Sequence, residues 1–422
     1  MPEVPAALPV IEIPEIHFNK VAPLFSNLPE AKQTVDIHPM EQFNQGWGTI
    51  LYRTTLPEAT PAGTVLKITE VHDWAQIYAD GKLLARLNRR KGEFTTTLPA
   101  LKKGTQLDIL VEAMGRVNFD KSIHDRKGIT EKVELVSGNQ AKELKNWTVY
   151  NFPVDYSFIK DKKYNDTKIL PAMPAYYKST FKLDKVGDTF LDMSTWGKGM
   201  VWVNGHAMGR FWEIGPQQTL FMPGCWLKEG ENEILVLDLK GPAKASIKGL
   251  KKPILDVLRE KAPETHRKDG EKLKLTGEKV THEGAFTPGN GWQEVRFATP
   301  VKGRYFCLEA LSPQANDNIA AIAEFDVLGA DSKPVSREHW KIRYADSEET
   351  RSGNRTADKI FDLQESTFWM TVDNVPYPHQ LVIDLSKVEN VTGFRYLPRA
   401  EKGYPGMIKE YRVYVKPADF NY

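Results

Sequence analysis

The loop at residues 397–406, LPRAEKGYPG, groups side-chain types that proteins use to hold a sugar. An aromatic ring packs against the apolar face of a sugar, while charged or amide groups hydrogen-bond to its hydroxyls. The preceding residues favour a strand, so the loop would lie at one end of a β-sandwich. Arg399, Glu401 and Tyr404 are therefore candidates for carbohydrate binding, with a solvated loop that binds nothing as the alternative.

A second aromatic group lies at residues 195–212, TWGKGMVWVNGHAMGRFW. Its Asn204-Gly205 pair predicts a type I′ hairpin turn, which needs positive φ at both central residues. On a strand, only alternate side chains share a face. We therefore expect most of the rings of Trp196, Trp202 and Trp212 to pack between sandwiches or against another domain, with sugar stacking as the alternative.

The motifs and the net charge exclude several other kinds of functional site. The 422 residues contain no HExxH, P-loop or GxSxG pattern, and two distant cysteines, Cys225 and Cys307, make no zinc motif. Lys+Arg 57 against Asp+Glu 55 leaves a net charge of +2, and no basic patch predicts nucleic-acid binding. No long apolar run predicts a membrane span. The Pro-rich start does not resemble a signal peptide, and we interpret it as the linker of a longer protein.

An internal repeat indicates the elements that carry these residues. WAQIYADGKLLARL at 74–87 matches KGMVWVNGHAMGRF at 198–211, and LKKGTQLDILVE at 101–112 matches LKEGENEILVLD at 227–238. The blocks recur in one order at nearly one spacing, which predicts two related β-sandwiches. We place them at residues 31–150 and 151–250, after a linker at 1–30.

The last part of the chain is also rich in strand-like segments. It predicts a third sandwich at 275–422. Between the second and third sandwiches, the apolar spacing in 242–262 favours a helix that Pro263 would end, and we expect a linker helix over 251–274. The fold class expected is therefore all-β.

The two repeats resemble a known family. The segment 188–239, together with MEQFNQGWGTILYRT at 40–54 and the segment 108–129, resembles the jelly-roll-like β-domains of family 35 β-galactosidases. The resemblance implies retaining hydrolysis of terminal β-galactosides by two carboxylates about 5–5.5 Å apart in a TIM barrel. A barrel needs about 250 residues, which do not precede residue 40, so no catalytic residue is assigned. The pair Asn232-Glu233 matches the family's acid/base dipeptide but is expected to be a turn.

The third region resembles discoidin-like (factor V/VIII C-type, carbohydrate-binding family 32) sandwiches, through 347–371 and 378–415. Strands that normally close this fold precede those segments here, at 303–329, so we infer a circular permutation. Many such domains hold a structural Ca²⁺ under a DGDxxTxW loop, and here the loop reads DLQESTFW. The resemblance implies Asp362, Gln364, Thr367 and Glu324 as metal ligands, with a hydrogen-bonded loop without an ion as the alternative.

These observations predict the non-catalytic C-terminal region of a β-galactosidase, inactive by itself and requiring no cofactor beyond structural calcium. Its partners would be the catalytic barrel and a galactose-containing glycan. The loops with His72-Asp73 and Arg116–Asn118 would approach the barrel mouth. A periplasmic or extracellular parent enzyme is expected. The main alternative is a free-standing glycan-binding or adhesion protein.

Overall fold

The computed structural model describes residues 8–119, 123–138, 140–167, 170–399 and 405–422. The chain divides into two compact units, one of residues 1–32, 47–49 and 149–261, the other of residues 33–46, 50–148 and 262–422. Regular structure is almost all strand, as expected. The short helical segments are α1 (Tyr156–Ile159) and the 3-10 turns Leu24–Ser26, Met40–Phe43, Arg89–Lys91, Gly224–Trp226 and Ala357–Phe361. In the described part of the chain, no helix is long and apolar enough to cross a membrane.

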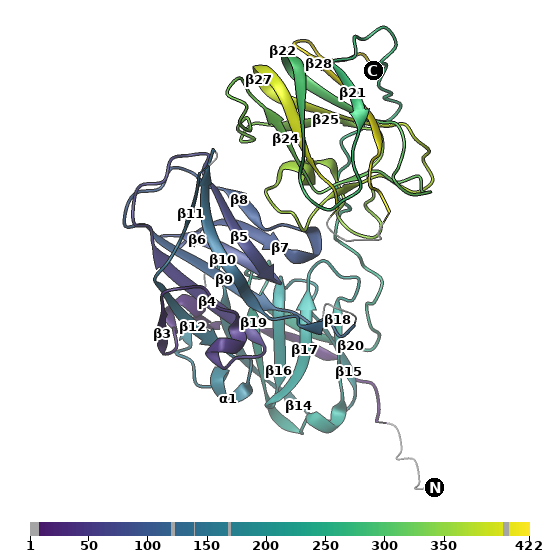
Figure 1. Cartoon of the computed structure of the whole chain (residues 1–422). Coiled ribbons are helices and arrows are strands. Elements are labelled where there is room, and N and C mark those ends of the chain that lie inside the picture. The colour runs from purple at the N-terminus through teal and green to yellow at the C-terminus, as the bar shows by residue number, and fades with distance from the viewer. Residues whose placement is uncertain (1–7, 120–122, 139, 168–169, 400–404) are drawn as a thin grey trace. The chain divides into compact units, whose positions relative to one another are not determined.

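Most of the first sandwich belongs to the second unit, and the sandwich consists of two sheets (Figure 1). One has the order β3-β12-β4-β9-β6-β7, with β3 (Ala31–Thr34), β12 (Trp147–Phe152), β4 (Gly48–Thr55), β9 (Gln106–Ala113), β6 (Trp74–Ala79) and β7 (Lys82–Asn88). The other has the order β11-β10-β5-β8, with β11 (Gln140–Glu143), β10 (Gly128–Ser137), β5 (Val65–His72) and β8 (Thr95–Thr97). Buried apolar residues line the strands of both sheets.

The second sandwich belongs to the first unit and repeats this plan. Its larger sheet has the order β13-β2-β14-β19-β16-β17, with β13 (Asn165–Asp166), β2 (Lys20–Pro23), β14 (Ala175–Leu183), β19 (Gly230–Asp238), β16 (Lys198–Val203) and β17 (His206–Trp212). Its smaller sheet has the order β1-β20-β15-β18, with β1 (Ile13–His17), β20 (Ser246–Leu250), β15 (Thr189–Asp192) and β18 (Thr219–Met222).

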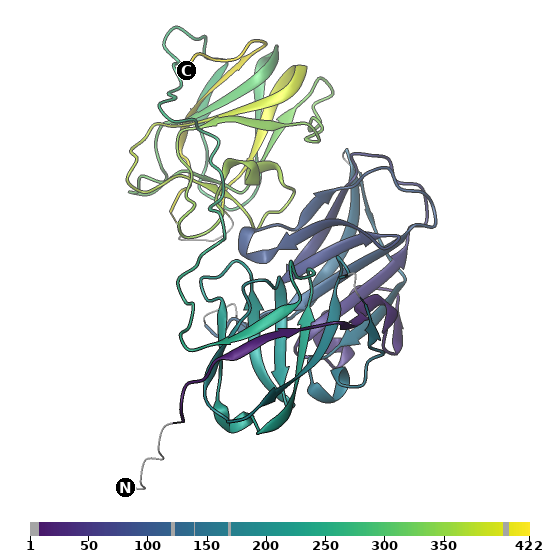
Figure 2. The same ribbon diagram turned by 180° about the vertical axis from the view of Figure 1, so that it is seen from behind.

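The N-terminal segment, which we expected to be a linker over 1–30, supplies two of these strands. β1 pairs with β20, and β2 pairs with β14. Figure 2 shows the purple β1 lying along the teal strands of the second sandwich. Ile13, Ile16 and Val21 are buried in its core. The alternation in IEIPEI indicates a half-buried strand, a pattern that the prolines obscure.

The sequence repeat corresponds to a repeated hairpin. β6 pairs with β7 and β9, and β16 pairs with β17 and β19 in the same arrangement. Both hairpins contain a register shift, after Ile77 and after Val201. The turns have the positive φ that the Asp-Gly and Asn-Gly pairs predict, with φ of 45° at Asp80 and 48° at Asn204.

Trp196 lies in the core of its own sandwich, which differs from the expectation that most of these rings pack between domains. Its ring centroid is 5.1 Å from those of Phe18 and Tyr177, and its indole N–H donates to the Ser246 carbonyl at 2.9 Å. Trp202 is also buried. Trp212 is half-buried, with the Lys198 ammonium 4.2 Å from its ring centroid. Packing thus accounts for Trp196 without a sugar.

The third sandwich belongs to the second unit. Its main sheet has the order β21-β28-β22-β27-β24, with β25 also paired to β27. These strands are β21 (His282–Ala285), β28 (Glu410–Lys416), β22 (Gln293–Ala310), β27 (His379–Leu397), β24 (Glu324–Leu328) and β25 (Lys341–Ala345); β23 (Ala321–Ile322) and β26 (Trp369–Met370) form a small second sheet. β24 and the second part of β22 lie in the expected closing segment and pair with β27, so segments 303–329 and 378–415 share one sheet.

The linker helix expected over 251–274 does not form. Residues 246–250, in the first part of the segment 242–262 that favoured a helix, form β20, and no helix lies between Leu250 and β21 in the described structure. Gly249 sits where a Cβ atom would lie 2.7 Å from the Ile13 side chain, so the chain approaches β1 closely. Pro253 lacks a backbone donor and disfavours a helix interior. Sheet pairing and proline together override the apolar spacing that favoured a helix.

Candidate functional site

The predicted cation loop follows the 3-10 turn Ala357–Phe361. The Thr367 hydroxyl oxygen lies 2.9 and 2.8 Å from the two Asp362 carboxylate oxygens and 2.9 Å from the Gln364 carbonyl. A hydroxyl has one proton and can donate it to only one of these three acceptors at a time. Leu363 has a φ of 66°, which turns the chain so that these oxygens face one another. The loop therefore places more acceptor oxygens around the Thr367 hydroxyl than its single proton can hydrogen-bond to.

Glu324 of β24 is buried beside this loop. One of its carboxylate oxygens, Oε2, is bound by the Arg337 guanidinium, while Oε1 is buried without a hydrogen-bond partner in the described structure. Burial raises the pKa of Glu324 to about 8, and the negative charge of Asp362 adds to the rise. Burial likewise raises the pKa of Asp362 to about 6. Two carboxylates therefore lie in surroundings that disfavour their charge.

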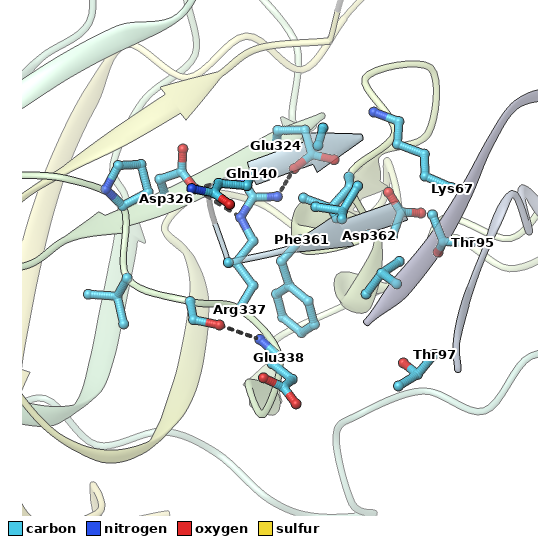
Figure 3. A pocket seen from close by; sticks show the side chains of 18 of the residues that line it. Lys67, Thr95, Thr97, Gln140, Glu324, Asp326, Arg337, Glu338, Phe361 and Asp362 are labelled. Atoms are coloured by element: carbon cyan, nitrogen blue, oxygen red, sulfur yellow. Dashed lines mark hydrogen bonds and ion pairs between the residues drawn. The ribbon is translucent and has the colours of Figure 1, made fainter. Parts of the chain in front are cut away.

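Two cations lie at the edge of this cluster. Arg337 also donates from Nε to Asp326 Oδ1 at 2.8 Å, and the Lys359 ammonium is 3.8 Å from Asp362 Oδ2. Figure 3 shows Glu324, Asp326, Arg337 and Asp362 among the residues that line a pocket. Sequence reasoning missed Arg337 and Lys359, because only the folded chain brings them to these carboxylates.

The donor set matches what calcium prefers. Calcium takes six to eight oxygen ligands, and carboxylate, carbonyl and hydroxyl oxygens all serve. The loop offers Asp362, the Gln364 carbonyl and the Thr367 hydroxyl, and Glu324 offers its unpaired Oε1. Among the described residues, no three His, Cys, Asp or Glu side chains converge as metal ligands, so carbonyl, hydroxyl and water oxygens would have to complete the shell.

The predicted sugar-binding loop is described only in part. The Arg399 guanidinium carbon lies 4.3 Å from the ring centroid of Phe368, and that of Arg355 lies 4.1 Å from the same ring. Glu401 and Tyr404 lie outside the described residues. Arg399 thus belongs to an arginine–phenylalanine cluster that the sequence did not predict. Its members come from separate segments, so no local spacing could reveal it.

The Asn232-Glu233 pair lies within β19, near its start, where Asn232 is opposite Phe181 and Glu233 is opposite Thr180 of β14. Asn232 is buried and its amide donates to the carbonyls of Lys228 and Gly230 at 2.8 and 3.1 Å. Glu233 accepts a hydrogen bond from the Tyr156 hydroxyl at 2.7 Å and pairs with Lys178 at 2.6 Å. The turn expected for this dipeptide is therefore wrong: both residues belong to a strand, and their side chains hold that strand to the preceding loop and to neighbouring side chains.

The loops with His72-Asp73 and Arg116–Asn118 share a charged network in the first sandwich. Lys127 Nζ lies 2.7 Å from both Asp73 Oδ2 and Asp125 Oδ2, and Arg89 bridges the same two carboxylates at 2.8 and 2.7 Å. His72 is fixed to the Arg126 carbonyl at 2.6 Å. The side chains of His72 and Asp73 are buried and paired, so their first role is to stabilise this network.

Between β9 and β10, the same network fixes residues that lie close in sequence to two exposed apolar side chains. Val117 N donates to Asp125 Oδ2 at 3.0 Å, and Arg116 donates to the Asp125 carbonyl at 2.7 Å. Phe119 and Ile123, which lie between these residues in the chain, are 79% and 60% exposed.

The comparisons with known proteins match this architecture. Residues 38–153 match the family model "Beta-galactosidase, first all-beta domain", residues 174–232 match "Beta-galactosidase, galactose-binding domain", and residues 344–422 match "F5/8 type C domain". The expected resemblance to β-galactosidase domains is confirmed. The third match begins at 344, although β22 and β24 complete the same sheet from earlier in the chain.

Several relatives are β-galactosidases or similar to them in name. Human Beta-galactosidase-1-like protein 3 is 31% identical over 269 residues, covering 60% of this chain and 39% of the relative. The Xanthomonas manihotis Beta-galactosidase is 32% identical, covering 52% and 36%, and the Bos taurus Beta-galactosidase is 34% identical, covering 53% and 37%. The chain therefore spans little more than a third of the length of these relatives.

Proposed function

We propose that this chain is the non-catalytic C-terminal region of a β-galactosidase. The observation that carries the proposal is the order of the three matched domains, in a chain that spans about a third of its β-galactosidase relatives. The catalytic barrel would be the main partner, and the third sandwich would bind a glycan through the loop with Arg399, Glu401 and Tyr404. The parent enzyme would work in the periplasm or outside the cell.

The test is an assay of the purified chain with an aryl β-galactoside. We expect no turnover above background, because the paired carboxylates of retaining hydrolysis would belong to the barrel. Turnover that disappears when a carboxylate within residues 1–422 is replaced would refute the proposal. The alternative is a glycan-binding protein that works without any barrel. Such a protein would bind glycans by itself, and adding a catalytic barrel would not change that binding.

We assign the exposed side chains of Phe119 and Ile123, in the first sandwich, to a contact with the barrel. Phe119 and Ile123 expose apolar area that a domain contact would bury, and the Lys127 network holds residues close to them in sequence in place. Phe119→Ser in a full-length β-galactosidase that contains this region should lower the thermal stability of the enzyme while leaving the melting of this chain alone unchanged. Equal effects on both would refute the assignment.

We also propose that the Asp362 loop binds calcium. Support comes from the oxygen atoms around Thr367 and from Glu324 Oε1, which is buried without a partner. A ligand at 100 times its Kd stabilises the folded state by about 2.7 kcal/mol. Calcium should therefore raise the melting temperature of wild type relative to EDTA, and Asp362→Asn should abolish the shift. The matched control is Asp358→Asn, which alters a more exposed carboxylate beside Lys359. An equal calcium shift in Asp362→Asn would contradict the site.

A further inference from the structure

The chain that connects the second sandwich to the third is largely exposed and irregular. β20 ends at Leu250, and the next strand, β21, does not begin until His282. Lys261 and Ala262 lie between them, are exposed and belong to no regular element. The chain also passes from one compact unit to the other between these two residues. Exposed, irregular chain at such a boundary is where endopeptidases preferentially cut folded proteins.

Upstream of this bond, hydrogen bonds hold the chain to the second sandwich. Val257 N donates to the Pro216 carbonyl at 3.0 Å, and Arg259 N donates to the Ile214 carbonyl at 2.8 Å. The Arg259 guanidinium also donates to the Ser194 carbonyl at 2.7 Å. An endopeptidase that cuts after basic residues must take the basic side chain into its specificity pocket, so these hydrogen bonds protect the bond after Arg259.

Downstream of this bond, the chain is held to the third sandwich. His266 N donates to Glu348 Oε2 at 2.5 Å, and the Arg267 guanidinium donates to a backbone carbonyl of that sandwich at 2.7 Å. The next basic residue, Lys268, lies in a turn that the Glu271 N–H closes by donating to the Lys268 carbonyl at 3.0 Å. Cleavage after either basic residue would first have to break these contacts.

The stretch between the two anchored parts has no such protection. In the described structure, no hydrogen bond or ion pair fixes residues 261–265. The chain there can enter the extended form that a protease cleft requires without first unfolding a sheet. Lys261 is thus the basic residue of this connection whose side chain and following bond are both accessible.

We propose that the Lys261–Ala262 bond is a processing site for an endopeptidase that cuts after basic residues. The Lys261 ammonium enters the acidic specificity pocket of the protease. Water then hydrolyses the amide: the carbon–nitrogen bond breaks, Lys261 gains a carboxylate and Ala262 leaves with a free amino group. The products, residues 1–261 and 262–422, together keep every described strand unbroken. The inference does not require the chain to be part of a β-galactosidase.

The test is a brief digestion of the native full chain with trypsin, with each cut bond identified and timed by mass spectrometry. We expect the Lys261–Ala262 bond to be cut about tenfold faster than the bonds after Arg259 and Arg267, because cutting there first breaks hydrogen bonds. The strands that flank the connection should stay intact during this digestion, since the cut requires no unfolding of either sandwich.

Four variants show whether the lysine and its bond are recognised. Lys261→Gln should slow this cut at least tenfold, while Lys261→Arg should keep it, because both basic side chains fit the same pocket. Ala262→Pro keeps the lysine but should block the cut, since proline removes the N–H and stiffens the chain after the bond. The matched control is Lys252→Gln: Lys252 is also exposed but precedes Pro253, so its loss should leave the cutting pattern unchanged.

Three results would overturn the inference. The first is cleavage after Arg259 or Arg267 that is as fast as cleavage after Lys261. The second is an unchanged rate of cutting at this bond in Ala262→Pro, or an unchanged rate of release of the C-terminal product in Lys261→Gln. The third is digestion of both products as quickly as they form, which would assign the cut to global unfolding. Thermal melting of each variant, which should match that of wild type, guards against misfolding.

Discussion

At the scale of single residues, the first sandwich depends on a lysine that water does not reach. Lys127 is 0% exposed and contacts Asp73, Asp125 and the Gly115 carbonyl. The ammonium and guanidinium groups beside Asp125 hold the pKa of that carboxyl well below its usual range, although burial opposes this. The sequence shows only VNFDKSIHDRKGI here, and nothing in it distinguishes Lys127 from its exposed neighbours.

The first prediction concerns this residue. Lys127→Met should destabilise the first sandwich by about 3–5 kcal/mol, because two buried carboxylates lose the fully buried one of the two cations that bridge them, and only the partly exposed Arg89 remains. The measurement is urea unfolding followed by circular dichroism. Lys132→Met is the control: Lys132 is 42% exposed in its side chain and pairs with Glu134 at the surface, so its loss should cost about 0–1 kcal/mol. Similar effects of the two changes would show that the buried network contributes little.

At the scale of elements, His266 is one of the residues that hold the segment entering the third sandwich, together with Arg267 and Glu271. His266 Nδ1 lies 2.8 Å from Glu348 Oε1, and the same carboxylate oxygen accepts from Ala357 N at 2.7 Å, at the start of the 3-10 turn before the cation loop. Although burial opposes it, the Glu348 carboxylate raises the pKa of His266. The entering segment and the cation loop therefore share one buried carboxylate.

The second prediction follows from the direction of that shift. A histidine whose pKa is raised in the folded state adds stability at pH values below its unfolded pKa of about 6.5, and loses it as the pH rises through the folded value. The stability difference between wild type and His266→Gln should therefore be largest near pH 5.5 and fall towards pH 8. Melting temperatures across this range measure it. A difference that grows with pH would contradict the pairing.

Local sequence patterns predicted the strands and turns better than they predicted the residues of the candidate site. Asn204-Gly205 and Asp80-Gly81 predicted both hairpins, since their φ preferences are a property of the residues themselves. The helix expected after residue 250 does not form, because residues 246–250 pair as a strand and Pro253 disfavours a helix interior. Asp362, Gln364 and Thr367 could be grouped because they lie within one loop. Arg337 and Arg395 could not, because strand pairing alone brings them to Asp326.

At the scale of the whole molecule, the second sandwich is built from two distant parts of the chain. β1 and β2 precede the first sandwich, and all its other strands follow it. Ile16, Phe18 and Val21 contribute to the same buried cluster as Trp196 and Val236. The first sandwich is thus an insertion, in chain order, into the second. This arrangement makes the N-terminal segment structural, although its proline content suggests a linker.

The third prediction tests this arrangement. Burying one large aliphatic or aromatic side chain contributes roughly 1.5–3 kcal/mol, so losing Ile13, Ile16, Phe18 and Val21 removes a stabilisation comparable with the whole 5–15 kcal/mol of a typical domain. Deletion of residues 1–23 should therefore leave residues 149–261 open to proteolysis, while the first sandwich stays resistant. A synthetic peptide of residues 8–26 added in trans should restore protection, because it returns both missing strands. Glu12→Ala, which changes only an exposed side chain of this segment, should behave as wild type. If the truncated chain resisted proteolysis without the peptide, the second sandwich would hold together on its later strands alone, and the N-terminal strands would be an accessory to it.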